Sequence, residues 1–266
     1  MKTDSSRSLE QEILPPVVHR HPMLSPQEGY SVEDILQFDF RARERLREEA
    51  PIQFTVEPKI HGVAVEIAYD RGILSRACTA GNGFRGEIVT PNIKTILTVP
   101  LTLWQIGQAP PFPDYLEVRG DVYMESGPFV ELIRERQKKG LDPFRDAKEA
   151  AMESLRQINP RITARRALNL FCHGVGEVTG PRPRTSYEQM VILQSWGFRV
   201  NRPHIRICDT TADVLEECRS IQERRRDFPF EIEGALVKIN RLDLQARLGS
   251  PGGSPGWSFI YRFAAE

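Results

Sequence analysis

The spacing of apolar residues switches from a helical to an extended period within the first eighty residues. Over residues 31–49 apolar side chains recur at intervals close to those of a helix, and Ser31 occupies an N-cap position. From residue 52 to residue 80 apolar and polar residues alternate, most clearly at 52–56 and 63–69, which predicts strands. The Asp-Arg-Gly sequence at 70–72 predicts a turn after the second strand.

The same patterns divide the rest of the chain into short strands and irregularly placed helices. Further strands are predicted over residues 73–79, 116–124, 168–175, 230–239 and 257–263, and further helices over 128–139, 146–157, 187–196 and 212–226. Strand and helix do not alternate strictly, so the pattern favours an α+β fold of largely antiparallel sheets with flanking helices. Residues 1–20, Ser-rich at first and with a Pro-Pro pair further on, are expected to form a flexible tail before one domain over 21–266.

Composition and charge exclude several classes of protein. Among 266 residues, 36 Lys and Arg balance 36 Asp and Glu, which argues against a broadly cationic nucleic-acid-binding coat. The apolar runs are too short to span a bilayer, and the polar first twenty residues lack the apolar stretch of a signal peptide. We therefore expect a cytoplasmic protein that does not contact a membrane.

The cysteines show no metal-binding spacing. There is no Cys-x-x-Cys and no Cys/His pair at zinc-ligand spacing among Cys78, Cys172, Cys208 and Cys218. The interpretation is four small core or surface residues in a reducing compartment, and no structural zinc site is expected.

The densest chemical feature is the sequence Glu-Pro-Lys-Ile-His-Gly at 57–62. In an extended segment, alternation places Glu57, Lys59 and His61 on one side, and Gly62 allows close backbone approach. A lysine at such a position can act as a covalent nucleophile when burial or neighbouring cations keep its amine neutral. The alternative is a surface lysine before a turn, since charged side chains are mostly exposed.

Several short segments, each weak alone, follow one another in order along the chain. They are His-Pro-Met-Leu-Ser at 21–25, Glu-x-Lys-x-x-Gly at 57–62, Gly-Asn-Gly-x-x-Gly-Glu at 81–87, Leu-Glu-Val-Arg-Gly at 116–120, Ser-Leu-Arg-Gln at 154–157 with Pro-Arg at 160–161, Phe-Cys-His-Gly-Val-Gly at 171–176, Glu-Gly-x-x-x-Lys at 233–238 and the stretch 257–263. This series resembles the adenylation (nucleotidyltransferase) domain of bacterial NAD-dependent DNA ligases. The resemblance runs from about residue 21 to 266 and implies an ATP-grasp-like nucleotidyltransferase fold.

The resemblance implies a role for Lys59 and for two cations. Lys59 would attack the α-phosphorus of NAD, release nicotinamide mononucleotide and keep AMP on its amine. In whole ligases the AMP then passes to a 5′-phosphate at a DNA nick and is displaced by the 3′-hydroxyl. Lys238 would be the first cation beside the phosphate and Arg262 the second.

The resemblance also implies a metal site and contacts to the nucleotide. Asp121 and Glu233 are the carboxylates that would hold Mg²⁺. Glu57 and the region of Ser25 would contact the adenine end, and His173 could stack on its ring. The implied cofactors are therefore NAD and Mg²⁺, and the nucleotide-contacting set comprises Ser25, Glu57, His61, Asp121, His173, Glu233 and Lys238.

The chain departs from the family pattern at the motif that carries the nucleophile and at others. The family motif is Lys-x-Asp-Gly, whereas position 61 is His, which exchanges a carboxylate for a weakly basic ring. The family's Thr-Arg-Gly-Asp-Gly loop has Ala80 and Asn82 in place of the Arg and the Asp. Its Asn-Pro-Arg-Asn stretch reads Asp-Ala-Lys-Glu at 146–149, and its last motif lysine is Arg262.

The two expected metal ligands are also exchanged. The family has Glu where this chain has Asp121, and Asp where it has Glu233, so one side chain is shorter by a methylene and the other longer. The two acids would still share a metal ion, displaced toward Asp121. Relaxed constraint after a loss of function predicts the same exchange.

Family ligases contain further modules. A small domain that clamps nicotinamide mononucleotide precedes the adenylation domain, and an OB-fold, a four-cysteine zinc module, helix-hairpin-helix repeats and a BRCT domain follow it. The matching region here begins near residue 21 and runs to residue 266, so these modules are expected to be absent. Because the motifs are altered, the pattern favours a naturally short paralogue over an excised piece of a ligase. Nicked DNA would then be bound weakly by this chain alone, with another protein supplying the missing modules.

Two clusters of arginines could contact DNA phosphates. One comprises Arg156, Arg161, Arg165 and Arg166, and the other is residues 224–226. Solvated helix faces are an equally good interpretation, because Glu223 and Asp227 flank the second cluster.

Three functions follow from these observations. The first is an NAD-dependent DNA ligase adenylation domain with Lys59 as the AMP acceptor, acting in DNA replication or repair. The second is a catalytically degenerate nucleotide-binding or DNA-associated module derived from a ligase. The third is a nucleotidyltransferase that uses ATP or GTP on another acceptor such as an RNA end, since lysine–nucleotide chemistry occurs in several enzymes.

Overall fold

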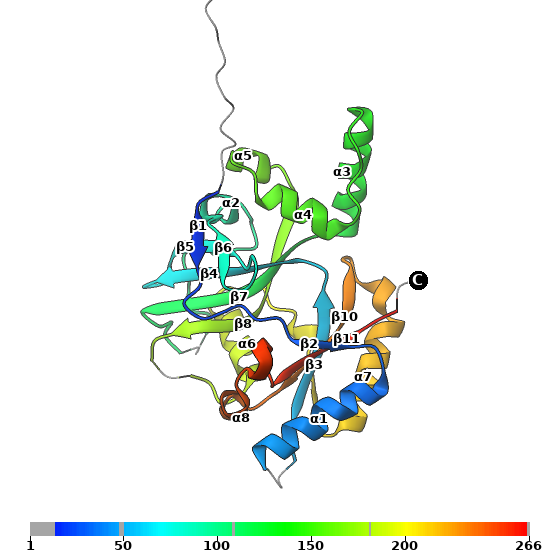
Figure 1. The fold of residues 1–266 in the computed structure, drawn as a ribbon. Coiled ribbons are helices and arrows are strands. Elements are labelled where there is room, and N and C mark those ends of the chain that lie inside the picture. Colours follow the sequence, from blue (N-terminus) through cyan, green and yellow to red (C-terminus); the bar gives the residue numbers. More distant parts are fainter. Residues whose placement is uncertain (1–13, 48–50, 108–109, 181, 265–266) are drawn as a thin grey trace, which may run out of the picture.

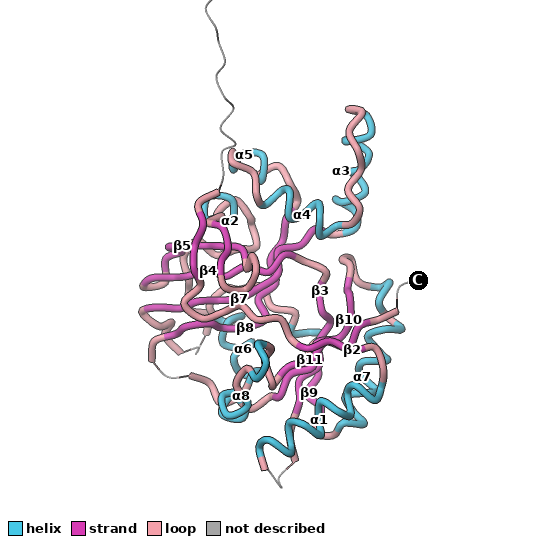
Figure 2. Tube along the Cα trace, in the orientation of Figure 1, coloured by secondary structure: helices cyan, strands magenta, loops and turns pink. Residues whose placement is uncertain are grey.

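The computed structural model describes residues 14–47, 51–107, 110–180 and 182–264. Its strands form two main sheets, which Figure 2 separates into two groups. The four-stranded sheet has the order β5-β4-β7-β8 and the five-stranded sheet the order β2-β11-β10-β3-β9. The bounds in the four-stranded sheet are β4 Val63–Asp70, β5 Ile73–Thr79, β7 Tyr115–Met124 and β8 Leu168–Val178. Those in the five-stranded sheet are β2 Gln27–Gly29, β3 Phe54–Ile60, β9 Arg206–Cys208, β10 Ile232–Ile239 and β11 Ser258–Arg262.

Neighbouring strands in these sheets are antiparallel except for β11 and β2, which pair in parallel within the described part of the chain. A separate two-stranded ribbon pairs β1 Pro16–Val18 with β6 Arg85–Glu87. The expected α+β class with largely antiparallel sheets is confirmed.

The helices cover the two sheets separately. In Figure 1, α1 Val32–Leu46, α7 Thr211–Glu223 and α8 Leu242–Leu248 lie beside the five-stranded sheet. The four-stranded sheet contacts α2 Thr90–Ile93, α4 Ala147–Leu155 and α6 Ser186–Ser195. The remaining helices are α3 Ser126–Lys138, which stands away from the sheets in Figure 1, α5 Pro160–Thr163 and the 3-10 turns Arg202–His204, Arg225–Asp227 and Pro251–Gly253.

Each sheet has its own hydrophobic core, and a smaller aromatic cluster joins them. Ile60 at the end of β3 packs with Tyr123 of β7, Phe171 of β8 and Phe230. The rings of Tyr123 and Phe171 are stacked with centroids 5.1 Å apart, and Phe230 meets both edge-on. Aromatic contacts of this kind are well suited to hold two layers in one relative position.

The connection between the sheets is short. Strand β3 ends at Ile60 in one sheet, and β4 begins at Val63 in the other, so His61 and Gly62 carry the chain across. A Cβ on Gly62 would lie 2.9 Å from the carbonyl oxygen of Val122, which is closer than ordinary contacts allow. Glycine at this position lets β3 and β4 cross close to β7, as the sequence suggests.

The flexible tail predicted over residues 1–20 extends too far along the chain, because residues near its end are structured. Residues 1–13 lie outside the described part, but Pro16–Val18 forms a strand on β6 and His19 is buried. The backbone N–H of His19 donates to the carbonyl of Phe84, which extends this pairing. The Pro-Pro pair misled the sequence interpretation because proline is tolerated at the edge of a sheet.

The longer predicted helices and strands are all present, with ends shifted by a few residues. The shorter elements β2, β6, β9, α2, α5 and α8 were not predicted, since three to seven residues carry too little periodic pattern. No helix among the described residues has the length and apolar character needed to cross a bilayer.

The N-cap of α1 provides a test of the local sequence signals. Ser31 Oγ accepts a hydrogen bond from the backbone N–H of Asp34, whose carboxylate accepts one from the Ser31 N–H. Replacing Ser31 by Ala removes one half of this capping box and should lower the free energy of unfolding by about 1 kcal/mol in urea titrations. Ser31→Thr keeps the hydroxyl and should stay close to the unaltered protein, and an equal loss in both variants would contradict a capping role.

Candidate active site

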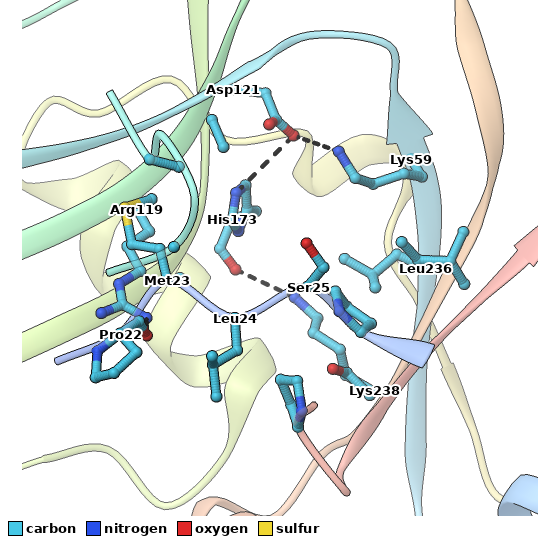
Figure 3. Close-up of a pocket in the computed structure, with 18 of the residues that line it drawn as sticks. Pro22, Met23, Leu24, Ser25, Lys59, Arg119, Asp121, His173, Leu236 and Lys238 are labelled. Carbon is cyan, nitrogen blue, oxygen red and sulfur yellow. Dashed lines mark hydrogen bonds and ion pairs between the residues drawn. The ribbon is translucent and has the colours of Figure 1, made fainter. Parts of the chain in front are cut away.

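A cleft of about 1550 Å³ lies between the two sheets. Its walls include Lys59 and Lys238 from the five-stranded sheet and Asp121 and His173 from the four-stranded sheet. Figure 3 shows these side chains converging, with His173 between Asp121 and Lys238. The cleft is larger than the roughly 300–1,000 Å³ of common small-molecule sites, so a dinucleotide would fit.

Lys59 lies near the end of β3, where the chain is about to leave its sheet. Its Nζ donates to Asp121 Oδ2 at 2.8 Å and to the carbonyl of Ile60 at 3.1 Å, and lies 3.6 Å from Glu233 Oε1. Burial by itself would lower the pKa of Lys59, but the two carboxylates outweigh it and raise the pKa above its usual value. The amine is therefore an ammonium while it is paired with these two carboxylates.

The two expected metal ligands flank Lys59. Asp121 comes from β7 and Glu233 from β10, and both side chains are nearly buried. Burial raises the pKa of Asp121, but the charge of Lys59 and the hydrogen bond from its amine outweigh burial and the pKa is lowered. For Glu233 burial likewise opposes ionisation, yet the hydrogen bond from His61 and the nearby cations lower its pKa to about 2. Both acids are charged at neutral pH.

His61 stands where the family motif has an acid, and it lies between two carboxylates. Its Nδ1 is 3.0 Å from Glu233 Oε2, and its Nε2 is 3.7 Å from Asp146 Oδ2. Asp146 also caps α4 by accepting from the Glu149 N–H. The family has Asn at the position of Asp146, so the acid lost at position 61 is matched by an acid gained beside it.

Lys238 and Glu57 form a buried ion pair below the cleft. Lys238 Nζ lies 2.5 Å from Glu57 Oε1 and donates to the carbonyl oxygen of His173 at 3.2 Å. Burial, followed by the charges of Lys59 and Lys238, lowers the pKa of His173, although Asp121 raises it. The His173 ring is therefore uncharged at neutral pH, as suits a ring that stacks on an apolar face.

Arg262 reaches the same group of acids from the last strand. It makes a bidentate contact with Glu28, at 2.6 and 2.9 Å, and its Nη1 lies 2.7 Å from Glu233 Oε2. The hydrogen bonds to Glu28 and then Glu233 raise the pKa of Arg262. Arg262 thus stands beside the acids around Lys59.

The rim of the cleft is built from two segments that the sequence motifs identify. Arg119 donates to the carbonyls of His21 and Pro22 at 2.6 and 3.2 Å, which holds the segment leading to Ser25 along the cleft (Figure 3). In the adjoining loop, which accepts a hydrogen bond from the Met23 N–H at Gly83, Asn82 Oδ1 accepts from the N–H groups of Phe84 and Arg85. Asn82 therefore closes the turn, a role for which its carbonyl oxygen serves as well as a carboxylate.

Every predicted site residue lies in or against the cleft. Those that line it are Ser25, Glu57, Lys59, Asp121, His173, Glu233, Lys238 and Arg262, whereas His61 reaches it through Glu233. Sequence reasoning missed Glu28, Arg119 and Asp146 as partners of these residues. Arg119 and Asp146 lay in recognised motifs, although these did not show which residues they contact, and no local pattern pointed to Glu28.

The arginine clusters are partly engaged within the protein. Arg156 makes a bidentate contact with Glu87 at 2.6 Å for each hydrogen bond, and Arg224 contacts Glu217 at 3.4 Å. Their charges are therefore partly neutralised before any phosphate approaches, which weakens the expectation that they bind DNA.

A cleft between two sheets with a lysine at its boundary is what a ligase-type nucleotidyltransferase requires, and the comparisons with known proteins point to the same class. The chain belongs to the NAD-dependent DNA ligase adenylation domain family, whose sequence profile matches residues 11–266. It is 42% identical over 250 residues to the DNA ligase of Syntrophus aciditrophicus (strain SB), covering 94% of this chain and 37% of that protein. The DNA ligase of Syntrophotalea carbinolica is 39% identical over 248 residues, covering 93% and 36% respectively. The chain thus spans little more than a third of the length of these relatives.

Among solved structures, an archaeal ATP-dependent RNA ligase aligns with a TM-score of 0.45 and 15% identity, over 93% of this chain and 49% of that chain. A likeness at this level gives no basis for transferring a function.

The low pKa of Glu233 predicts an acid-dependent loss of stability. Its folded pKa of about 2 lies below the ordinary 4.5, so its ionisation stabilises the fold above about pH 4.5, and this contribution is lost as pH falls toward 2. The full contribution is about 3 kcal/mol. Urea unfolding should show the difference between the unaltered protein and Glu233→Gln narrowing as pH falls from 5 to 2.5, whereas a constant difference would contradict it.

The contacts of His61 predict a coupled effect with Asp146. Restoring the family acid by His61→Asp places a third carboxylate beside Glu233 and Asp146, and should lower the free energy of unfolding by roughly 1–2 kcal/mol. Adding Asp146→Asn removes one of these charges and should recover most of the loss, since Asn also caps a helix. A double-mutant cycle by thermal unfolding measures this coupling, and simple additivity of the two changes would rule it out.

Proposed function

We propose that Lys59 accepts AMP from NAD through a phosphoramide bond, as the first half-reaction of DNA nick sealing. The observation that carries this proposal is the position of Lys59 Nζ in the cleft, 2.8 Å from Asp121 and 3.6 Å from Glu233. A nucleophile held between two sheets can meet a nucleotide that both sheets bind. The bond from the α-phosphorus to nicotinamide mononucleotide breaks as the bond to the Lys59 nitrogen forms.

Lys238 and Arg262 supply the positive charge that a phosphate group needs. Each is held by an acid of its own, Glu57 for Lys238 and Glu28 for Arg262, so their positions are set before a ligand arrives. Pre-positioned cations stabilise negative charge without reorganising during the reaction. This supports the roles of first and second cation proposed for them.

The amine of Lys59 must lose a proton before it attacks. Asp121 accepts a hydrogen bond from it at 2.8 Å, and the charge of this carboxylate raises the pKa of Lys59 and so favours the protonated amine. Weakening the attraction of Asp121 and Glu233 would therefore release the nucleophile. Asp121 and Glu233 are also the proposed ligands of a magnesium ion.

Asp121 and Glu233 fit a magnesium ion by their chemistry. Both are buried, ionised carboxylates that approach one point beside Lys59, and hard oxygen donors suit Mg²⁺. Such an ion would neutralise phosphate charge and compete with Lys59 for the two acids. Glu233 Oε2 is already engaged by His61 and Arg262, which favours Asp121 as the stronger ligand.

The adenine end of NAD is assigned to the side of the cleft that holds His173. Its uncharged ring faces the cleft beside Ser25 and Lys238 in Figure 3. We assign stacking on the base to His173 and edge contacts to Ser25 and Glu57. His61 would act on the bound nucleotide through Glu233.

The later steps concern the whole ligase. The relatives are named DNA ligases, and this chain spans about a third of their length. We propose that AMP on Lys59 passes to a 5′-phosphate at a nick in DNA replication or repair. DNA-binding modules, on the same protein or a partner, would hold the duplex, because this domain alone should bind nicked DNA weakly.

Intact-mass measurement tests the first half-reaction directly. Incubation with NAD and Mg²⁺ should add the mass of one AMP to the protein, and Lys59→Ala should abolish the addition because the nucleophile is lost. Lys94→Ala, which changes an exposed lysine away from the cleft, serves as the matched control and should label normally. Chelation of Mg²⁺ should slow labelling strongly.

The same mass measurement, with other nucleotides, distinguishes the two alternative functions: a nucleotidyltransferase that uses another donor and a nucleotide-binding module without activity. Labelling by ATP or GTP but not by NAD would keep the nucleophile and overturn the choice of donor. Thermal stabilisation by AMP without an adduct from any donor would make this a nucleotide-binding module whose chemistry has been lost.

A further inference from the structure

A second group of potential metal ligands lies outside the cleft, and we call it the His19 cluster. It consists of His19, which follows β1, Glu66 in β4 and Cys78 in β5. Glu66 and Cys78 face each other across the antiparallel pair β4–β5, and His19 packs onto them from the N-terminal ribbon. All three side chains are buried, and none lines the cleft.

We propose that the His19 cluster binds one zinc ion. His19 Nδ1 lies 3.5 Å from Glu66 Oε1 and 3.9 Å from Cys78 Sγ, and the sulfur lies 4.0 Å from the same carboxylate oxygen. Bond lengths of about 2.0–2.3 Å in a tetrahedral zinc site separate such ligand atoms by about 3.3–3.6 Å. Movements of a few tenths of an ångström therefore bring all three onto one ion. The fourth position is left for a water molecule.

The His19 ring is oriented as a metal ligand requires. Its Nε2 lies 3.2 Å from the carbonyl oxygen of Ala80, to which it can donate, and this arrangement leaves the lone pair of Nδ1 facing Glu66 and Cys78. A backbone carbonyl on the other ring nitrogen is the usual support of a histidine bound to zinc. Imidazole, carboxylate and thiolate together favour zinc over the harder magnesium ion.

The charged side chains around the His19 cluster balance one another. Glu66 and the buried Glu117 are matched by two guanidinium groups: Arg76 lies 3.7 Å from Glu66 and 3.5 Å from Glu117, and Arg119 lies 3.5 Å from Glu66. Zinc would displace the thiol proton of Cys78 to solvent as the zinc–sulfur bond forms, so one of its two charges is balanced by the new thiolate. The remaining positive charge would compete with Arg76 and Arg119 for the carboxylate of Glu66.

The position of the His19 cluster gives the ion a structural role. The backbone N–H groups of His19 and Met23 donate to the carbonyls of Phe84 and Gly83, so the segment from residue 16 to 25 is attached to the loop at 80–86. Residues 22–25 and the loop at 80–86 form the rim of the cleft. Zinc bound by His19, Glu66 and Cys78 would fasten this rim to the four-stranded sheet.

Metal binding to the chelator-treated protein tests the proposal. Titration with Zn²⁺ should give one equivalent bound per chain and a higher Tm, and Co²⁺ in its place should produce the near-ultraviolet absorption of a cobalt–thiolate bond. Cys78→Ser and His19→Gln should each lose that equivalent and the rise in Tm. Cys218→Ser, which changes a buried cysteine of α7 in the other core, is the matched control and should bind as the unaltered protein does.

Four results would overturn the proposal. The first three are no stoichiometric zinc in the unaltered protein, a Co²⁺ complex without the thiolate absorption, and equal binding by Cys78→Ser. Zinc binding that is lost in Asp121→Asn but kept in His19→Gln would place the ion in the cleft, and would also overturn the proposal. If Cys78→Ser does not fold, His19→Gln and the absorption spectrum of the unaltered protein decide the question.

Discussion

The passage of the chain from one sheet to the other at His61 and Gly62 is the constraint on which the site depends. Strand β3 belongs to the five-stranded sheet and β4 to the four-stranded sheet, with two residues between them. Lys59 is thereby held at the boundary of the sheets, where it meets Asp121 of β7 and Glu233 of β10. Buried charges are tolerated only when they are paired, so these contacts require the two sheets to stay in one relative position. The aromatic cluster of Tyr123, Phe171 and Phe230 packs at the same boundary.

Several departures from the family motifs can be interpreted from the contacts that the altered residues make. The acid missing at position 61 is matched by Asp146, and Glu233 accepts contacts from His61, Lys59 and Arg262 together. Asn82 keeps the turn that the family's acid would also close. In this chain the acids around Lys59 are therefore each paired with at least one cation or with His61. This is the behaviour expected when a buried network must remain neutral while its members change.

The rim of the cleft connects the site to the N-terminal ribbon. Arg119 fastens the segment before Ser25 and also lies 3.5 Å from Glu66, so it joins the nucleotide side of the four-stranded sheet to the His19 cluster. Residues 16–19, which sequence reasoning places in a tail, pair instead with β6 and with Phe84 in the loop before it, beside the cleft. A substitution that weakens the packing of the His19 cluster would therefore also loosen the residues at the rim of the cleft.

Local sequence was enough to determine the longer helices and strands, the Ser31 cap, the α+β class and the ordered series of motifs around Lys59. These depend on periodicity and on contacts within a few residues, which a single chain displays directly. Only the tertiary structure decided that Asp146 faces His61, that Glu28 holds Arg262, and that His19 meets Cys78 fifty-nine residues away. The expectation that there is no structural zinc site rests on the spacing of cysteines and histidines along the chain, which does not record that His19 and Cys78 lie together. Contacts between distant segments arise from how the two sheets pack, and spacing along one chain does not record that packing.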